Sequence, residues 1–140
     1  MKKKFILFIA VIFTLAMVSS AYAGKCPQPR KTKSAPGGIA KKDNTKKANK
    51  ANGEKLYQKK AKPMACKMCH GAKGGGDGKL GKALKPSPRD FTCKKTMKKV
   101  SAGQMYWIIK NGSKGTGMAP MKLKDKEIWD VIKYIREDLM

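Results

Sequence analysis

The residue types best suited to chemistry in this 140-residue chain stand together at Cys66-Lys67-Met68-Cys69-His70. A C-x-x-C pair followed at once by histidine is the attachment signature for c-type haem. Two thiols at this spacing can add across the two vinyl groups of one haem, and the next residue then lies under the iron. The chain has a single histidine. Its place in this motif favours one haem c attached through Cys66 and Cys69, with His70 as an iron ligand.

Two other kinds of site use the same residue types. Cys66 and Cys69 could form a redox-active dithiol, but no strand-helix pattern of a thioredoxin-like fold surrounds them. The same cysteines could bind zinc with His70 and Cys93. Adjacent Cys69 and His70 are poorly placed to chelate one tetrahedral ion, so the sequence favours haem over zinc.

A second protein ligand to the iron is expected from a methionine. Met118 and Met121 lie in the loop Gly115-Thr116-Gly117-Met118-Ala119-Pro120-Met121, where a side chain can be aimed inward. Iron held by His and Met is an electron-transfer arrangement that raises the reduction potential. The flanking glycines let the backbone approach a porphyrin, which favours Met118, with Met121 as the alternative.

Three helices are expected to position these groups, and no stretch shows the period-two alternation of a strand. The clearest covers 125–139, where apolar residues recur at helical spacing. A second covers about 102–110 and begins after the capping residue Ser101. A third covers roughly 51–61. Residues 71–100 are rich in glycine and proline and are expected to be mostly loop, so the sequence indicates an all-α fold.

The N-terminus has the composition of a secretory signal. Residues 1–23 join three lysines, an apolar run and the sequence Ala21-Tyr22-Ala23, so cleavage is expected after Ala23. The apolar run has about 14 residues, short of the roughly 20 that a membrane-spanning helix needs. The mature protein is therefore expected in the periplasm or another exported compartment.

The mature chain divides by composition. Residues 24–52 hold nine Lys or Arg and no aromatic side chain; this basic arm or linker is expected to be disordered. Residues 53–140 are the expected folded domain, with few large apolar side chains for its length, which hints that a non-protein group fills the interior. Cys26 and Cys93 remain after the motif is assigned. Two spare cysteines in an exported protein suggest a disulfide, with free thiols or pairing between molecules as alternatives.

Charge indicates the kind of partner. The chain has 33 Lys or Arg against 9 Asp or Glu, a formal net charge of +24. Lysines near the motif and near the methionine loop would form a positive ring that attracts an acidic redox partner. A basic surface also suits peripheral contact with an anionic membrane. No helix-turn-helix, zinc-finger or aromatic-basic strand pattern is present, so specific nucleic-acid binding is not expected.

The sequence resembles the class I c-type cytochromes over about residues 50–140. The motif at 66–70, the glycine- and proline-rich loop that follows, Gly117-Met118 and the final helix carry the resemblance. It implies three or more helices and long Gly/Pro loops wrapped around one covalent haem, with Met118 as the ligand methionine. It also implies a backbone carbonyl that accepts the ring proton of His70, for which Pro86 and Pro88 are the candidates.

The expected function is that of an exported, monomeric single-haem carrier that passes electrons between redox partner proteins by Fe(II)/Fe(III) cycling, without being an enzyme. One alternative is a haem enzyme or small-ligand-binding haem protein with an easily displaced distal ligand. Another is a cytochrome subunit of a larger redox complex. The sequence does not separate the carrier from the subunit.

Overall fold

Every regular element in the described part of the chain is helical. The computed structural model describes residues 26–28 and 32–140, so the predicted signal peptide, residues 1–23, lies outside the described residues. In chain order the helices are α1 (Gly37–Ala40), η1 (Thr45–Lys47), α2 (Lys50–Lys55), η2 (Leu56–Lys60), α3 (Lys67–His70), η3 (Gly81–Ala83), α4 (Lys94–Met97), α5 (Ala102–Asn111), α6 (Asp125–Tyr134) and η4 (Ile135–Leu139). The all-α prediction is confirmed.

The three helices expected from the sequence are all present. α2 continues into η2, α6 continues into η4, and α5 stands between them in the chain. α5 begins after Ser101, whose hydroxyl accepts a hydrogen bond from the Gln104 backbone N–H at 3.1 Å, as expected of an N-cap. It ends at Gly112, where φ is 73°.

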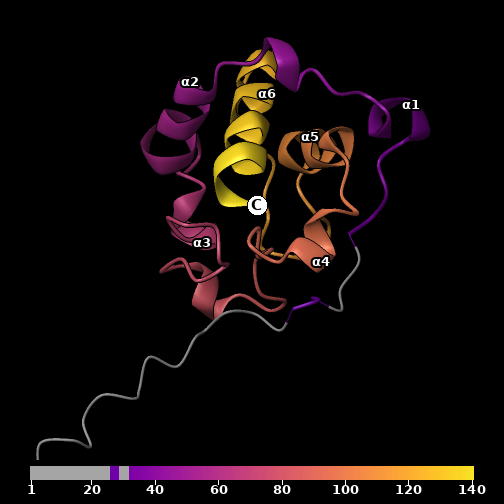
Figure 1. The fold of residues 1–140 in the computed structure, drawn as a ribbon. Helices are drawn as coiled ribbons and strands as arrows, with labels where there is room; N and C mark the ends of the chain where they lie inside the picture. Colours follow the sequence, from indigo (N-terminus) through magenta and orange to yellow (C-terminus); the bar gives the residue numbers. More distant parts are fainter. Residues whose placement is uncertain (1–25, 29–31) are drawn as a thin grey trace, which may run out of the picture.

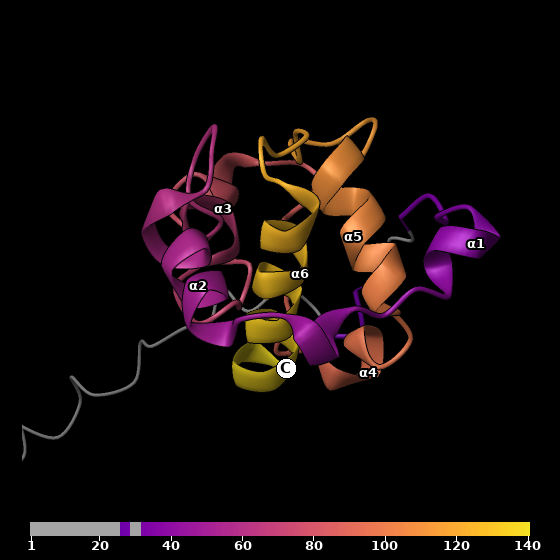
Figure 2. The ribbon, with the colours of Figure 1, turned by 90° about the horizontal axis from the view of Figure 1, so that it is seen from above.

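α6 lies at the centre of the fold, with α2 on one side and α5 on the other (Figure 1, and from above in Figure 2). The crossing with α2 is close because Gly53 has no side chain. A Cβ atom at Gly53 would meet the backbone carbonyl oxygen of Asp130. The apolar stripe of α6 then packs inward, with Ile128, Val131 and Ile132 almost completely buried.

The same crossing contains a buried carboxylate. Asp130 has no exposed surface, and its side chain accepts hydrogen bonds from the backbone N–H of Asn49 at 2.7 Å and from the Asn52 amide at 2.8 Å. Buried charges are tolerated when they are hydrogen-bonded in this way. Asp130 therefore fixes where α2 begins relative to α6.

Residues 32–49 follow a defined path before α2, although composition predicted a disordered arm over residues 24–52. Gln104, on α5, accepts a hydrogen bond from the Ala35 backbone N–H at 2.6 Å and donates one to the Lys33 carbonyl at 2.9 Å. The Ser101 hydroxyl donates to the Ala40 carbonyl at 2.7 Å. Composition predicted disorder because the segment has few apolar groups of its own. Its partners are polar groups on α5, which composition does not reveal.

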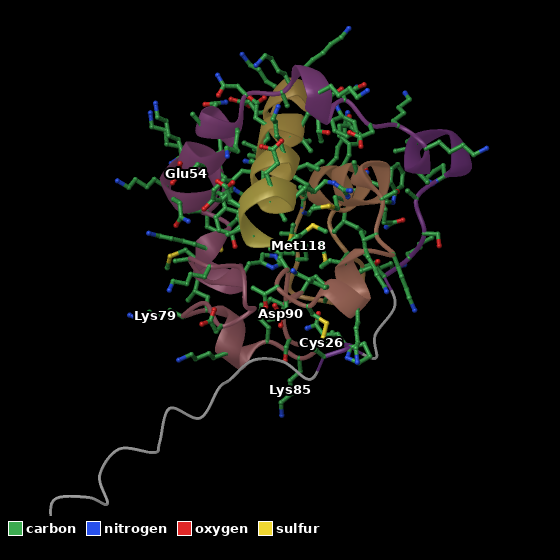
Figure 3. The ribbon with its side chains drawn as sticks, viewed as in Figure 1. Cys26, Glu54, Lys79, Lys85, Asp90 and Met118 are labelled. Carbon is green, nitrogen blue, oxygen red and sulfur yellow. A yellow bond between two sulfur atoms is a disulfide. The ribbon has the colours of Figure 1, made fainter. Side chains whose placement is uncertain are left out.

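A disulfide joins Cys26 to Cys93, 67 residues apart, and it appears beside α4 in Figure 3. The sequence left open whether these two cysteines pair within one chain, pair between molecules or stay free. In the structure they pair within one chain. Residues 26–28 lie beside α4, and residues 32–49 pass along α5 and α6. None of the described helices is long and apolar enough to cross a membrane.

Gly53→Ala tests the close crossing of α2 and α6. The added methyl group would push against the Asp130 backbone, so the free energy of unfolding should fall by about 3 kcal/mol, the upper part of the overpacking range. Urea unfolding measures this change. Gly38→Ala is the matched control, because a Cβ there meets nothing within 4 Å; it should change stability by less than about 0.5 kcal/mol. Equal effects from the two substitutions would contradict the packing argument.

Candidate haem site

A cavity opens between the α3 side and the α5 side of the fold. Its atom-free space, open mouth included, is about 1250 Å³. Apolar side chains make up much of its wall: Leu84, Phe91, Met97, Met105, Ile108, Ile109, Val131 and Ile135. The polar and sulfur-containing groups that line it include Cys66, Cys69, His70, Met118 and Met121. All the residues predicted for the site, with the alternative methionine, therefore border one cavity.

The motif forms a single helical turn at one wall of this cavity. The backbone N–H groups of Cys69 and His70 both donate to the Cys66 carbonyl, at 3.2 and 2.9 Å. Gly71 then ends the turn with φ at 81°, a conformation that glycine adopts without strain. This turn brings both thiols and the imidazole, which lie within four positions of one another in sequence, to the same cavity.

The glycine-rich loop after the motif folds back over it. Backbone N–H groups of Gly76, Gly78 and Leu80 donate to the carbonyls of His70, Cys69 and Met68, at 2.8, 3.1 and 2.8 Å. A Cβ at Gly78 or Gly81 would lie within 2.6 Å of the motif backbone. The glycines are therefore needed for backbone to lie directly against backbone, and this contact holds the motif turn in place.

His70 is held by one ring nitrogen. Its Nδ1 lies 3.0 Å from the Arg89 carbonyl oxygen. Because a carbonyl only accepts, Nδ1 carries the proton and Nε2 keeps a free lone pair. Burial lowers the pKa of His70, which favours the neutral ring. Neutral imidazole with one nitrogen fixed by a hydrogen bond is the form in which histidine binds metals.

The accepting carbonyl belongs to Arg89, and not to Pro86 or Pro88 as the sequence suggested. The predicted kind of interaction is present, one residue further along. The His70 ring also stacks on Phe91, with ring centroids 4.6 Å apart and planes 17° apart. Two independent contacts therefore fix the orientation of the ring.

The two motif cysteines are free thiols in the structure. Burial raises the pKa of Cys66 to about 12, and burial raises the pKa of Cys69 as well. Dithiol oxidoreductases need the opposite shift, because the thiolate is the attacking species. Cys93 is bonded to Cys26 and is not available as a zinc ligand. The described residues contain no group of three or more His, Cys, Asp and Glu that could hold a metal ion.

Met118 and Met121 both face the cavity from the loop between α5 and α6. The Met118 carbonyl accepts from the Ser113 backbone N–H at 2.8 Å, and the Met121 N–H donates to the Ile109 carbonyl at 2.9 Å. Both side chains are partly buried against the core. In the view of Figure 3, Met118 lies near the middle of the fold. The preference for Met118 over Met121 stays a prediction.

A cytochrome c family model matches residues 50–137, well over half of the chain. The chain belongs to the cytochrome c family. As a c-type cytochrome it belongs with proteins that carry covalently bound haem and transfer electrons. No curated protein matches it. Among solved structures it is similar to a chain of the Kuenenia stuttgartiensis reducing HAO-like protein complex Kustc0457/Kustc0458, with 28% identity and a TM-score of 0.53. The match covers 64% of this chain and 43% of that one, so this cytochrome corresponds to less than half of that chain's length.

The residues around the cavity of this cytochrome fit haem c. Two thiols can form thioether bonds, an imidazole lies directly after them in the motif, and the thioethers of Met118 and Met121 reach the cavity from the loop between α5 and α6. The remaining wall is mostly hydrocarbon, as suits a porphyrin face. The fit rests on this donor set inside one apolar cavity.

Sequence reasoning about this cytochrome missed one support of the motif. The Tyr57 hydroxyl donates to the Gly71 carbonyl at 2.8 Å, directly after His70, and its side chain has no exposed surface. The sequence carries only a weak signal of this hydrogen bond, a tyrosine in the helix before the C-x-x-C-H motif. The acceptor is a backbone carbonyl, and every residue has one.

Tyr57→Phe tests this support. The change removes one buried hydrogen bond and leaves the Gly71 carbonyl without that donor, so unfolding free energy should fall by about 1 to 2 kcal/mol. Denaturant unfolding of the haem-loaded protein measures the loss. The ring contacts with Phe91 and Tyr134 do not need the hydroxyl, so a loss nearer to that of a Tyr57→Ala variant would show that packing is disturbed as well.

Proposed function

We propose that this protein is an exported single-haem electron carrier. One haem c is attached through Cys66 and Cys69, and His70 and Met118 are the iron ligands. The observation that carries the proposal is that both thiols, the single imidazole with its Nδ1 held by the Arg89 carbonyl, and Met118 all line one apolar cavity. When bound, the group supplies one-electron Fe(II)/Fe(III) chemistry.

The chain's own residues have separate tasks in this proposal. Cys66 and Cys69 hold the cofactor covalently, so it cannot be lost on dilution. The Arg89 carbonyl and Phe91 fix the plane of the His70 ring. The apolar wall excludes water, and no side chain of the site has to move a proton or break a substrate bond. A site with these properties limits reorganisation when an electron arrives or leaves.

Positive charge at the mouth of the cavity supports docking of acidic partners. Pro63 and Met64, Ser113, and Met121 line the cavity, and each has an exposed lysine beside it in sequence: Lys62, Lys114 and Lys122. The Lys122 backbone N–H donates to the Lys62 carbonyl at 2.8 Å, so these two segments meet. None of the three lysines forms an ion pair with another described residue.

Export to the periplasm or a similar compartment is part of the proposal. The composition of residues 1–23 supports it, as does the Cys26–Cys93 disulfide, because disulfides persist in oxidising compartments. As a free carrier, the protein would be monomeric.

A second candidate is a cytochrome subunit of a larger redox complex. The similarity to a chain of a reducing HAO-like protein complex favours it. Gel filtration of native extract separates the two: elution near the size of the mature chain supports the carrier, and elution with a large complex supports the subunit. A haem enzyme or ligand-binding protein is the remaining alternative, and it requires Met118 to be absent from the iron or easily displaced.

Absorption spectra of the matured protein and two variants test the ligand set. We expect a sharp reduced α band, and a weak far-red band in the oxidised protein that reports sulfur ligation of the iron. Met118→Ala should abolish the far-red band and allow carbon monoxide to bind, because the thioether is gone. Met121→Ala, the matched control, should keep the band. The reverse result would assign Met121, and a wild-type protein that binds carbon monoxide readily would favour the ligand-binding alternative.

Electron transfer to a small anionic oxidant tests the positive mouth. The rate should fall as ionic strength rises from about 0.01 to 0.15 M, where the screening length drops from about 30 to 8 Å. The double variant Lys114→Glu, Lys122→Glu should lower the low-salt rate by about tenfold, at the small end of electrostatic steering. Lys46→Glu combined with Lys55→Glu makes the same charge change in η1 and α2. An equal loss of the low-salt rate in both double variants would mean that the rate depends only on the total charge of the protein.

A further inference from the structure

Gln28 makes an unusual number of contacts for a residue so far from the haem motif in sequence. Its side-chain amide donates to the Pro88 carbonyl at 3.0 Å. Its side-chain oxygen accepts from the Asp90 backbone N–H at 3.0 Å and from Arg89 Nη1 at 3.2 Å. The two polar groups of the Gln28 amide therefore form three hydrogen bonds, to three consecutive residues.

Those three residues carry the carbonyl that orients His70. Arg89, the middle one, supplies the oxygen that lies 3.0 Å from His70 Nδ1. Gln28 binds the carbonyl before it and the N–H after it, so the peptide units on both sides of the Arg89 Cα are held by one side chain. Rotation of this segment would move the oxygen away from the His70 ring and would break the Gln28 contacts at the same time.

Gln28 is itself fixed by the disulfide. Cys26, two residues before it, is bonded to buried Cys93. The Gln28 backbone N–H donates to the Thr96 hydroxyl at 3.1 Å, on α4 directly after Cys93. The far end of the same loop is held by Asp90, whose buried carboxylate accepts from the Thr92 N–H at 2.8 Å and from its hydroxyl at 2.6 Å. The loop is thereby anchored on both sides of Arg89.

We propose that Gln28 is a positioning residue for His70, held in place by the Cys26–Cys93 disulfide and acting through the Pro88–Asp90 backbone. The proposal rests on the proposed function, in which His70 binds the iron. Its physical content is that a hydrogen bond at Nδ1 fixes the ring and raises the basicity of the opposite nitrogen. A more basic ligand favours the ferric state, so Gln28 lowers the reduction potential by keeping that hydrogen bond short.

The test compares Gln28→Leu with the wild-type protein, both carrying haem. Leucine has a similar size and removes the three side-chain hydrogen bonds while leaving the disulfide and the backbone contact to Thr96. We expect the His70 Nδ1 proton, followed by NMR, to exchange with solvent about tenfold faster, of the order by which loss of an outer partner weakens other metal sites. The reduction potential should rise.

Gln58→Leu is the matched control. Gln58 also donates two side-chain hydrogen bonds, to the Ala72 carbonyl at 2.9 Å and to the Tyr134 hydroxyl at 3.1 Å, and it neither lines the cavity nor contacts the Pro88–Asp90 segment. It should leave Nδ1 proton exchange and potential unchanged even if it lowers stability. If Gln28 has a merely structural role, Gln28→Leu will change Nδ1 proton exchange and the reduction potential no more than Gln58→Leu does. That result would overturn the proposal.

A second variant keeps the proposal testable if Gln28→Leu does not fold. Gln28→Glu keeps the oxygen that accepts from Asp90 and Arg89 and loses the donor to Pro88, so proton exchange should rise by less than in the leucine variant but above wild type. Unchanged exchange in Gln28→Glu overturns the proposal. Failure of the proposed function is distinct, because it appears in the wild type itself, as the absence of covalent haem or of an iron-bound His70 in the same spectra.

Discussion

The hydrogen bond between His70 Nδ1 and the Arg89 carbonyl is the contact on which the rest of the site depends. The hydrogen bond that one imidazole nitrogen makes with its partner decides which nitrogen carries the proton and which one can bind a metal. The protein supplies that partner from backbone, so the surrounding segment has to be rigid. The glycine loop over the motif, the Asp90–Thr92 turn and the disulfide-anchored Gln28 all act on this segment or on the turn that carries His70.

The rest of the fold compensates for a small protein core. Its own apolar side chains pack where α2 and η2 meet α6 and where α5 meets α6. Tyr57 of η2 contacts Tyr134 of α6 in the first of these regions. Several of these core residues, among them Met105, Ile109, Val131 and Ile135, also line the cavity. A bound porphyrin would turn that wall into core, which explains why so few large aliphatic residues suffice. The excess of lysine stays on the surface, where it affects partners more than folding.

The sequence predicted the parts of this structure that have residue-type signatures. The C-x-x-C-H motif, the apolar stripe of α6 and the cap of α5 each depend on particular side chains in a particular spacing. Backbone partners have no such signature, which is why the carbonyl was assigned to a proline and not to Arg89. The defined path of residues 32–49 was not predicted for a related reason, because it depends on hydrogen bonds to Gln104, Ser101 and Asp130 on other helices. Gln28 was unpredictable because its role depends on a cysteine pairing that the sequence left open.

The Cys26–Cys93 bond also gives the polypeptide a closed topology. The ring it forms contains the whole C-x-x-C-H motif, whereas both loop methionines lie outside it on the C-terminal tail of the ring. When the chain unfolds, the ring limits how far His70 can move from the segment that carries Arg89, because both lie within it. The disulfide places no such limit on Met118 or Met121, which lie outside the ring. Cleavage of a peptide bond within the ring would leave the two pieces joined by the disulfide. Cleavage between Cys93 and the methionine loop would separate the segment that carries Met118 and Met121 from the rest of the chain. The two proposed iron ligands therefore differ in how the chain holds them. His70 lies inside the disulfide-closed ring, whereas Met118 is held in place by folding alone.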